Sequence, residues 1–136
     1  MQLVMTGSQS MSTAYPLPSV IGHRGAKAIS PENTIAGIRT AKAWGTTCVE
    51  VDVMLTLDGI PVIHHDNTLD RCTSGTGSLS AQTWEQLQEL DAGSHFGADF
   101  EGERIPTLTA LVHECKQLGI ALMVEIKHSN DDATAV

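Results

Sequence analysis

The stretch CVEVDVML at residues 48–55 alternates its side chains with a period of two, which is typical of a β-strand. Its valines would face one side of a sheet, whereas Glu50 and Asp52 would leave the other side with Cα atoms about 6–7 Å apart. A strand that packs its valines against helices aims its acids at a second covered face, where unpaired charge is costly. The stretch therefore predicts a buried strand whose two carboxylates contact a positively charged group.

Short apolar runs alternate with amphipathic segments on both sides of this strand. Further strands are expected at residues 20–23, 61–65 and 121–127. Helices are expected at residues 35–44, 84–90 and 108–118. The second helix follows a capping box, Thr83-x-x-Gln86. This alternation of strands and helices is typical of an α/β protein.

The link between the strands at 48–55 and 61–65 is short and carries Asp58-Gly59 at its centre. A crossover helix between parallel strands needs about a dozen residues or more, and Asp-Gly usually marks a hairpin. Either the two strands are antiparallel, at least locally, or one helix of a parallel unit has been lost. The sequence leaves both alternatives open.

The chain of 136 residues is long enough for one domain and too short for two full-sized ones. Eight Lys and Arg against sixteen Asp and Glu give a net charge of −8, which disfavours binding to nucleic acids and anionic membranes. Residues 1–18 predict a flexible leader before a domain at 19–136, with no signal peptide and no membrane span of about 20 apolar residues. The three cysteines lack C-x-x-C spacing and are interpreted as packing residues, so we expect a cytoplasmic protein.

A third acid, Glu125, alternates with apolar residues in the last expected strand and can reach the same interior as Glu50 and Asp52. Three carboxylates without clustered thiols suit Mg²⁺ or Ca²⁺ rather than zinc. A buried salt-bridge network fits the same pattern, with Arg24 beside Glu50 and Asp52 and with Lys127 beside Glu125. Periodicity alone leaves both interpretations open.

Two histidines stand where expected strands end and loops begin, His23 after the first strand and His65 after the third. Histidine gives and takes protons near neutral pH, so two of them beside a metal would serve as general acid and general base. A histidine at a strand end is also commonly a loop contact, and that alternative stays open for each. Arg24 and Lys127 supply the positive charges that an anionic substrate requires in an acidic protein.

Seven motifs occur in order between residues 19 and 127. They are His23-Arg24-Gly25-Ala26, Pro31-Glu32-Asn33-Thr34, Glu50-Val51-Asp52-Val53, the Asp58-Gly59 turn, His65-Asp66 followed by Thr68-Leu69-Asp70-Arg71, Ile105-Pro106-Thr107-Leu108 and Glu125-Ile126-Lys127. Together they resemble the glycerophosphodiester phosphodiesterases, within the phospholipase-C-like phosphodiesterase superfamily. The short link around Asp58-Gly59 is also similar to that of the family.

The resemblance implies a TIM-like barrel that hydrolyses glycerophosphodiesters to sn-glycerol 3-phosphate and an alcohol, with a divalent cation, Mg²⁺ or Ca²⁺, in phospholipid and glycerol metabolism. The implied substrate is a small molecule. The resemblance makes His23 and His65 the acid/base pair and matches Arg24 and Lys127 to positions that contact the phosphate. The metal-binding carboxylates it implies are Glu50, Asp52 and Glu125.

A complete (β/α)₈ barrel takes about 250 residues, so this chain with four expected strands corresponds to the first half of one. An inserted loop and helix segment is expected at residues 67–106. The chain is then a piece of a longer enzyme that lacks its C-terminal half, an inactive product, or a half-barrel that closes by self-association. Two other functions stay open: a truncated, non-catalytic half-barrel that binds metal or phosphate, and a glycoside hydrolase that uses the carboxylates.

Overall fold

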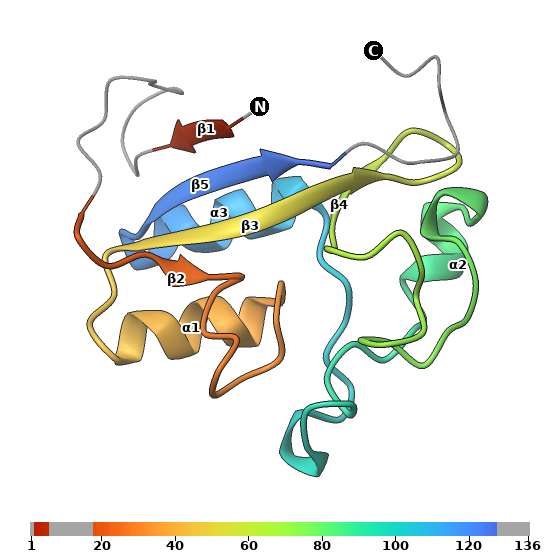
Figure 1. The fold of residues 1–136 in the computed structure, drawn as a ribbon, viewed down its shortest axis with the longest axis horizontal. Helices are drawn as coiled ribbons and strands as arrows, with labels where there is room; N and C mark the ends of the chain where they lie inside the picture. Colours follow the sequence, from red (N-terminus) through yellow and green to blue (C-terminus); the bar gives the residue numbers. More distant parts are fainter. Residues whose placement is uncertain (1, 6–17, 128–136) are drawn as a thin grey trace.

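The computed structural model describes residues 2–5 and 18–127 of the chain. Its strands are β1 (Gln2–Met5), β2 (Gly22–His23), β3 (Cys48–Leu55), β4 (Pro61–Ile63) and β5 (Ala121–Ile126). Its α-helices are α1 (Ile35–Ala43), α2 (Trp84–Leu87) and α3 (Leu108–Leu118), and short 3₁₀ turns lie at Leu79–Ala81 and Ala98–Phe100. Figure 1 shows these elements around one open sheet.

The sheet has the strand order β1-β5-β3-β2, and β2, β3 and β5 run parallel. Strand β3 lies at its centre, since β5 pairs along one side of it while β2 and β4 share the other side. Strand β4 is antiparallel to β3, so the turn around Asp58-Gly59 closes a hairpin, which decides between the two alternatives that the sequence left open. Figure 1 shows β3 as the long central strand.

Strand β1 corrects part of the sequence analysis, which expected a flexible leader at residues 1–18. Residues 2–5 pair antiparallel with the outer edge of β5. The four residues of β1 carry no alternation of apolar and polar side chains, and the strand is defined by the β5 backbone with which it pairs. No local pattern therefore indicates it. Residues 6–17 of the expected leader lie outside the described residues.

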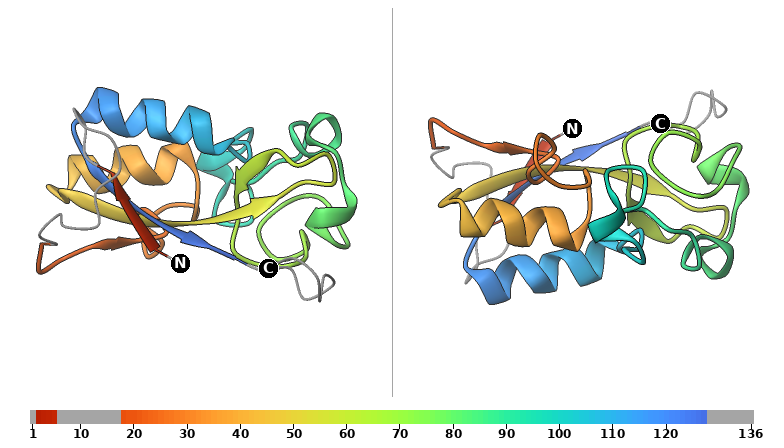
Figure 2. Two further views of the ribbon diagram at one scale, coloured as in Figure 1. Left: turned by 90° about the horizontal axis from the view of Figure 1, so that it is seen from above. Right: turned by 90° about the horizontal axis from the view of Figure 1, so that it is seen from below.

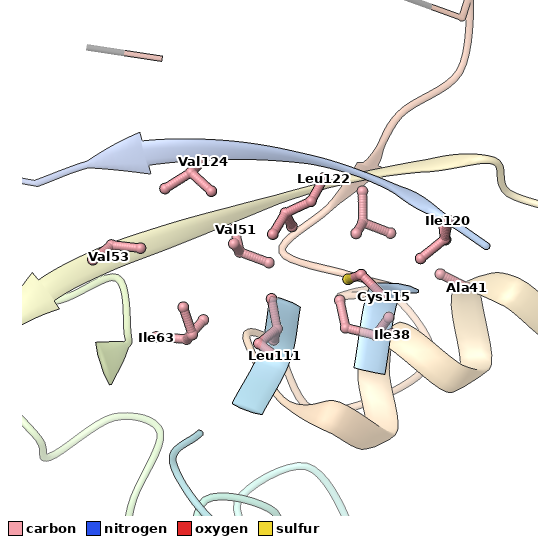
Figure 3. Close-up of a cluster of buried hydrophobic side chains, with 11 residues drawn as sticks. Ile38, Ala41, Val51, Val53, Ile63, Leu111, Cys115, Ile120, Leu122 and Val124 are labelled. Carbon is pink, nitrogen blue, oxygen red and sulfur yellow. The ribbon is translucent and has the colours of Figure 1, made fainter. Parts of the chain in front are cut away.

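Helices α1 and α3 lie side by side on one face of the sheet, as Figure 2 shows from two directions. The hydrophobic core fills the space between these helices and the valine face of β3. Ile38 of α1 and Leu111 of α3 are fully buried there against Val51 and Leu122, and Figure 3 shows how these side chains converge. The burial of the valines on the helix side leaves the acids of β3 to the opposite face, as the alternation predicts.

Local signals placed the helix ends well. The side chain of Thr107 accepts a hydrogen bond from the Ala110 backbone at the start of α3, and Gly119 ends that helix in a left-handed conformation with φ 66°. The expected capping box between Thr83 and Gln86 is present. Helix α2 ends at Leu87, three residues earlier than expected, because the chain turns more tightly there and Leu90 N–H donates to the Leu87 carbonyl.

The segment at residues 67–106 has a small core of its own. Its side chains pack against Met54 at the end of β3, and the fully buried members include Leu69, Leu79 and Leu87. This second cluster holds the loop that follows β4 against the sheet. Of the helices in the part of the chain that the structure describes, none is both long and apolar enough to cross a membrane.

Replacing Leu111 with alanine should lower the free energy of unfolding by about 2–5 kcal/mol, because it leaves a cavity between α3 and the sheet. Chemical denaturation of the purified chain measures this change. The matched control is Leu57→Ala, since Leu57 is exposed and its truncation should cost less than about 0.5 kcal/mol. Equal losses in the two variants would contradict the packing described for the α3 interface.

Candidate active site

Three carboxylates meet on the face of the sheet opposite the helices. Asp52 of β3 lies directly across from Glu125 of β5, and Glu50 lies two residues earlier on β3. One oxygen from each of the three carboxylates lies within 4.8 Å of the others. Glu50 and Asp52 are buried, whereas Glu125 is partly exposed. The backbone register of two parallel strands thus brings together the acids that the sequence singled out.

Two cations and an amide approach this cluster. Lys127 Nζ lies 3.2 Å from Glu125 Oε1 and 3.7 Å from Asp52 Oδ1. On the other side, Asn33 Nδ2 donates to Asp52 Oδ2 at 3.0 Å, and Arg24 Nε lies 3.5 Å from the same oxygen. The hydrogen bond from Lys127 lowers the pKa of Glu125. Asp52 is therefore the carboxylate that contacts all three of these groups.

Backbone strain accompanies this arrangement in the loop after β2. Arg24 and Asn33 adopt left-handed conformations with φ of 52° and 57°, which residues other than glycine rarely do. In this conformation the Arg24 N–H points at Glu50 Oε2, 3.4 Å away, and the Asn33 N–H donates to the Arg24 carbonyl. The two strained residues of this loop thus direct polar groups at the acids of β3, Arg24 at Glu50 and Asn33 at Asp52.

Glu50 is the group that fits a metal ion best. Its Oε1 is buried and has no hydrogen-bond partner among the described residues. Burial, followed by the neighbouring charge of Asp52, raises the pKa of Glu50 to about 7. An orphaned carboxylate oxygen beside two further carboxylates is a hard-oxygen donor set, which suits Mg²⁺ or Ca²⁺. The residues present therefore fit a divalent cation held by Glu50, Asp52 and Glu125.

The first histidine, His23, ends β2 and pairs in register with Glu50. Its Nε2 lies 3.8 Å from Glu50 Oε2, and 61 % of its side chain is exposed. Partial burial and then the charges of Arg24 and Lys27 lower the pKa of His23. The lowered pKa favours the neutral imidazole, which is the form that accepts a proton.

The second histidine, His65, follows β4. The backbone N–H of His64 donates to the Asp52 carbonyl, so His65 comes one residue after this pairing with β3. His65 Nδ1 lies 2.8 Å from Asp66 Oδ1. His64 is buried and its Nε2 donates to the Thr68 carbonyl at 2.9 Å, so its side chain faces the loop and not the carboxylate cluster.

The sequence analysis expected Arg24 beside Asp52, as observed, but missed the second partner of its guanidinium. Arg24 Nη1 donates to Glu32 at 2.8 Å rather than to Glu50 or Asp52, and Glu32 also accepts two hydrogen bonds from Arg71. Burial of Glu32 opposes its ionisation, but the hydrogen bonds from Arg71 and Arg24 outweigh it and lower the pKa of Glu32 to about 2. Glu32 and Arg71 stand in two of the quoted motifs, which was the one signal that pointed to them.

Comparison with known proteins identifies the family. The model of the glycerophosphoryl diester phosphodiesterase family matches residues 23–135. The chain belongs to this family. It is 45 % identical over 118 residues to human glycerophosphodiester phosphodiesterase 1, covering 85 % of this chain and 36 % of that protein. It is 44 % identical over 108 residues to a glycerophosphodiester phosphodiesterase of Caldanaerobacter subterraneus, covering 79 % of this chain and 44 % of the relative.

Solved structures of the family support the fold. A phosphodiesterase of Oleispira antarctica, in complex with the product sn-glycerol-3-phosphate, matches with a TM-score of 0.80 and 45 % identity over 82 % of this chain and 45 % of that chain. A glycerophosphodiester phosphodiesterase of Agrobacterium tumefaciens matches with a TM-score of 0.73 and 34 % identity over 81 % of this chain and 46 % of that one. These matches confirm the expected α/β fold class, half of a TIM-like barrel. The chain spans less than half the length of these relatives.

Replacing Glu32 with glutamine should lower the free energy of unfolding at pH 7 by about 3 kcal/mol, because it leaves Arg24 and Arg71 without their shared anion. The pKa of Glu32 is depressed, so its contribution to stability is present above the unfolded-state pKa of 4.5 and is lost as the pH falls through about 2. The difference in the free energy of unfolding between Glu32→Gln and wild type should therefore become smaller between pH 5 and pH 3. Urea denaturation at a series of pH values measures it.

The control for this prediction is Glu114→Gln. Glu114 pairs with Arg39 at 2.7 Å, but the arginine is exposed, so the change should cost less than about 1 kcal/mol. A loss in Glu32→Gln that is as small as in Glu114→Gln, or that does not depend on pH, would contradict the role given to Glu32.

Proposed function

We propose that this chain carries the catalytic residues for the hydrolysis of glycerophosphodiesters to sn-glycerol 3-phosphate and an alcohol, a step in phospholipid breakdown and glycerol metabolism. The observation that carries the proposal is the cluster of Glu50, Asp52 and Glu125, with a buried, orphaned oxygen on Glu50. The complex of a related phosphodiesterase with sn-glycerol-3-phosphate supports the choice of substrate class.

A divalent cation, Mg²⁺ or Ca²⁺, would be held by the three carboxylates. When bound there it supplies Lewis-acid stabilisation of the charge that develops on a phosphoryl oxygen. The cation also offsets the net charge of −8, which otherwise repels an anionic substrate. Binding requires Glu50 to be ionised, so affinity for the cation should weaken as the pH falls below about 7.

Arg24 and Lys127 would bind the phosphate. Arg24 Nη1 is held by Glu32, whereas its Nε is buried and has no hydrogen-bond partner within the described ranges. Lys127 Nζ lies between Asp52 and Glu125 at the partly exposed side of the cluster. Both groups thus present positive charge next to the carboxylates, and an ammonium and a guanidinium are suited to phosphoryl oxygens.

The two histidines would move the protons. His23 is exposed and adjoins Glu50, and its lowered pKa favours the neutral ring. His65 holds its Nδ1 against Asp66, which leaves Nε2 as the nitrogen that exchanges a proton with substrate. One histidine takes the proton of the attacking hydroxyl and the other gives a proton to the leaving oxygen, as general base and general acid.

A second candidate function is a half-barrel that binds metal or phosphate without turning over substrate. The observation that favours it is that the carboxylate cluster, Arg24 and Lys127 lie together, since these groups can hold a cation or a phosphate without any proton carrier. Phosphate-binding loops of TIM barrels often follow the seventh and eighth strands. The two candidates share the carboxylate cluster and differ only in turnover.

The purified chain should release sn-glycerol 3-phosphate from glycerophosphocholine or glycerophosphoethanolamine in the presence of Mg²⁺ or Ca²⁺, and a chelator should abolish release. His23→Ala and His65→Ala should each lower kcat by about 10²–10⁴, because a positioned proton carrier is lost. A coupled assay for glycerol 3-phosphate measures these rates.

The matched control is His113→Ala, since His113 is exposed on α3, on the helical side of the sheet, and should leave the rate unchanged. Activity that survives the chelator or the loss of either histidine would contradict the mechanism. A folded chain that binds the cation but releases no product would favour the non-catalytic half-barrel.

A further inference from the structure

Ion pairs connect the two histidine loops through Asp66, Arg71 and Glu32, three side chains to which the proposed reaction gives no direct role. Asp66 contacts His65, Arg71 contacts Asp66, Glu32 contacts Arg71, and Arg24 contacts Glu32. We call these five residues the ionic chain. It begins at a histidine after β4 and ends at the arginine next to His23, so it joins two parts of the site that are far apart in sequence.

Arg71 is the central member of the ionic chain. Its Nε and Nη2 donate to the two oxygens of Asp66 at 2.9 and 3.0 Å, and its Nη1 and Nη2 donate to the two oxygens of Glu32 at 2.6 and 3.1 Å. A guanidinium can serve two carboxylates in this way because its five donors lie in one plane. The lysine ammonium is a point charge and cannot hold both carboxylates with two bonds each.

The position of Asp66 matters because its carboxylate faces Nδ1 of His65. A carboxylate only accepts hydrogen bonds, so it selects the imidazole form with the proton on Nδ1 and the lone pair on Nε2. If the Asp66 side chain rotated away, the His65 ring would be free to reorient and to place its proton on Nε2. Arg71 occupies both oxygens of Asp66 and is itself held by Glu32, which is buried.

We propose that Arg71 is a positioning residue for His65: it fixes the Asp66 carboxylate on Nδ1 of that ring and, through Glu32, sets this arrangement relative to Arg24. This inference rests on the proposed function for its effect on turnover. The effect on the His65 tautomer is a property of the folded chain and is measured without substrate.

The inference also gives the segment at residues 67–106 a role at the site. Arg71 lies in that segment, next to Leu69 and Cys72, which are both buried. The second hydrophobic cluster therefore anchors the backbone that carries Arg71. The segment thus stabilises the position of His65 indirectly, because Arg71 holds Asp66 and Asp66 contacts His65.

The test is ¹⁵N NMR of histidine-labelled chain at about pH 8.5, where imidazoles are neutral, with the His65 signals assigned from His65→Gln. In wild type, His65 should be the Nδ1–H tautomer. In Arg71→Met the Nε2–H form should become populated, and in Arg71→Lys the tautomer should be only partly restored. The matched control is Arg39→Met, because Arg39 forms an exposed pair with Glu114 outside the ionic chain.

Turnover provides the second readout. If the proposed function holds, Arg71→Met should lower kcat by about 10–100-fold, by analogy with the loss of the hydrogen-bond partner of a metal-ligating histidine. KM should change less than about twofold, because the nitrogens of Arg71 are bound to Asp66 and Glu32. Asp66→Asn should give the same pattern, and it replaces Arg71→Met if that variant does not fold.

The tautomer and the turnover measurements distinguish failure of the proposed function from failure of the role given to Arg71. If wild type hydrolysed no substrate, the proposed function would be contradicted. The His65 tautomer alone would then decide the role of Arg71. A His65 spectrum that stays as in wild type in folded Arg71→Met, or that changes equally in Arg39→Met, would overturn the inference.

Discussion

The burial of Glu50 and Asp52 side by side on one strand is the constraint on which the rest of this site depends. Their side chains leave the same face of β3, and both are almost fully removed from solvent. Two adjacent carboxylates in such a place repel each other and lose their hydration. The surrounding chain compensates with Lys127, Arg24 and the amide of Asn33. Among the described residues, Glu50 Oε1 is the buried carboxylate oxygen that has no hydrogen-bond partner, and we propose that a divalent cation binds there.

Much of the fold could be predicted from the sequence, because local signals determine it. Alternation identified β3 and the face of its valines, threonine caps placed α2 and α3, and Asp58-Gly59 indicated the β3–β4 hairpin. These features depend on residues within one turn or one strand. Strand β1 could not be predicted, because its four residues become a strand only by pairing with the distant β5 edge.

In the candidate site too, features set by local sequence could be predicted, and features set by distant contacts could not. The carboxylates on β3 and β5 followed from periodicity, since strand alternation decides which side chains share a face. The pairing of Arg24 with Asp52 and of Lys127 with Glu125 was also expected, whereas the pairs around Glu32 were not. Glu32 and Arg71 are 39 residues apart and come from two loops, and no spacing rule connects such residues. The sequence assigned Arg24 to Glu50 and Asp52; the structure shows its guanidinium beside Asp52 and adds a third carboxylate, Glu32.

The most direct test of the claim that Glu50, Asp52 and Glu125 form a metal site is a crystal structure of the chain grown with Ca²⁺, with anomalous diffraction to locate the ion. We predict one anomalous peak in contact with carboxylate oxygens of all three residues, Oε1 of Glu50 among them. In crystals of Asp52→Asn this peak should be lost. A map without a peak at the cluster, with Lys127 still bound to Asp52 and Glu125 at saturating Ca²⁺, would contradict the account and leave a salt-bridge network in its place.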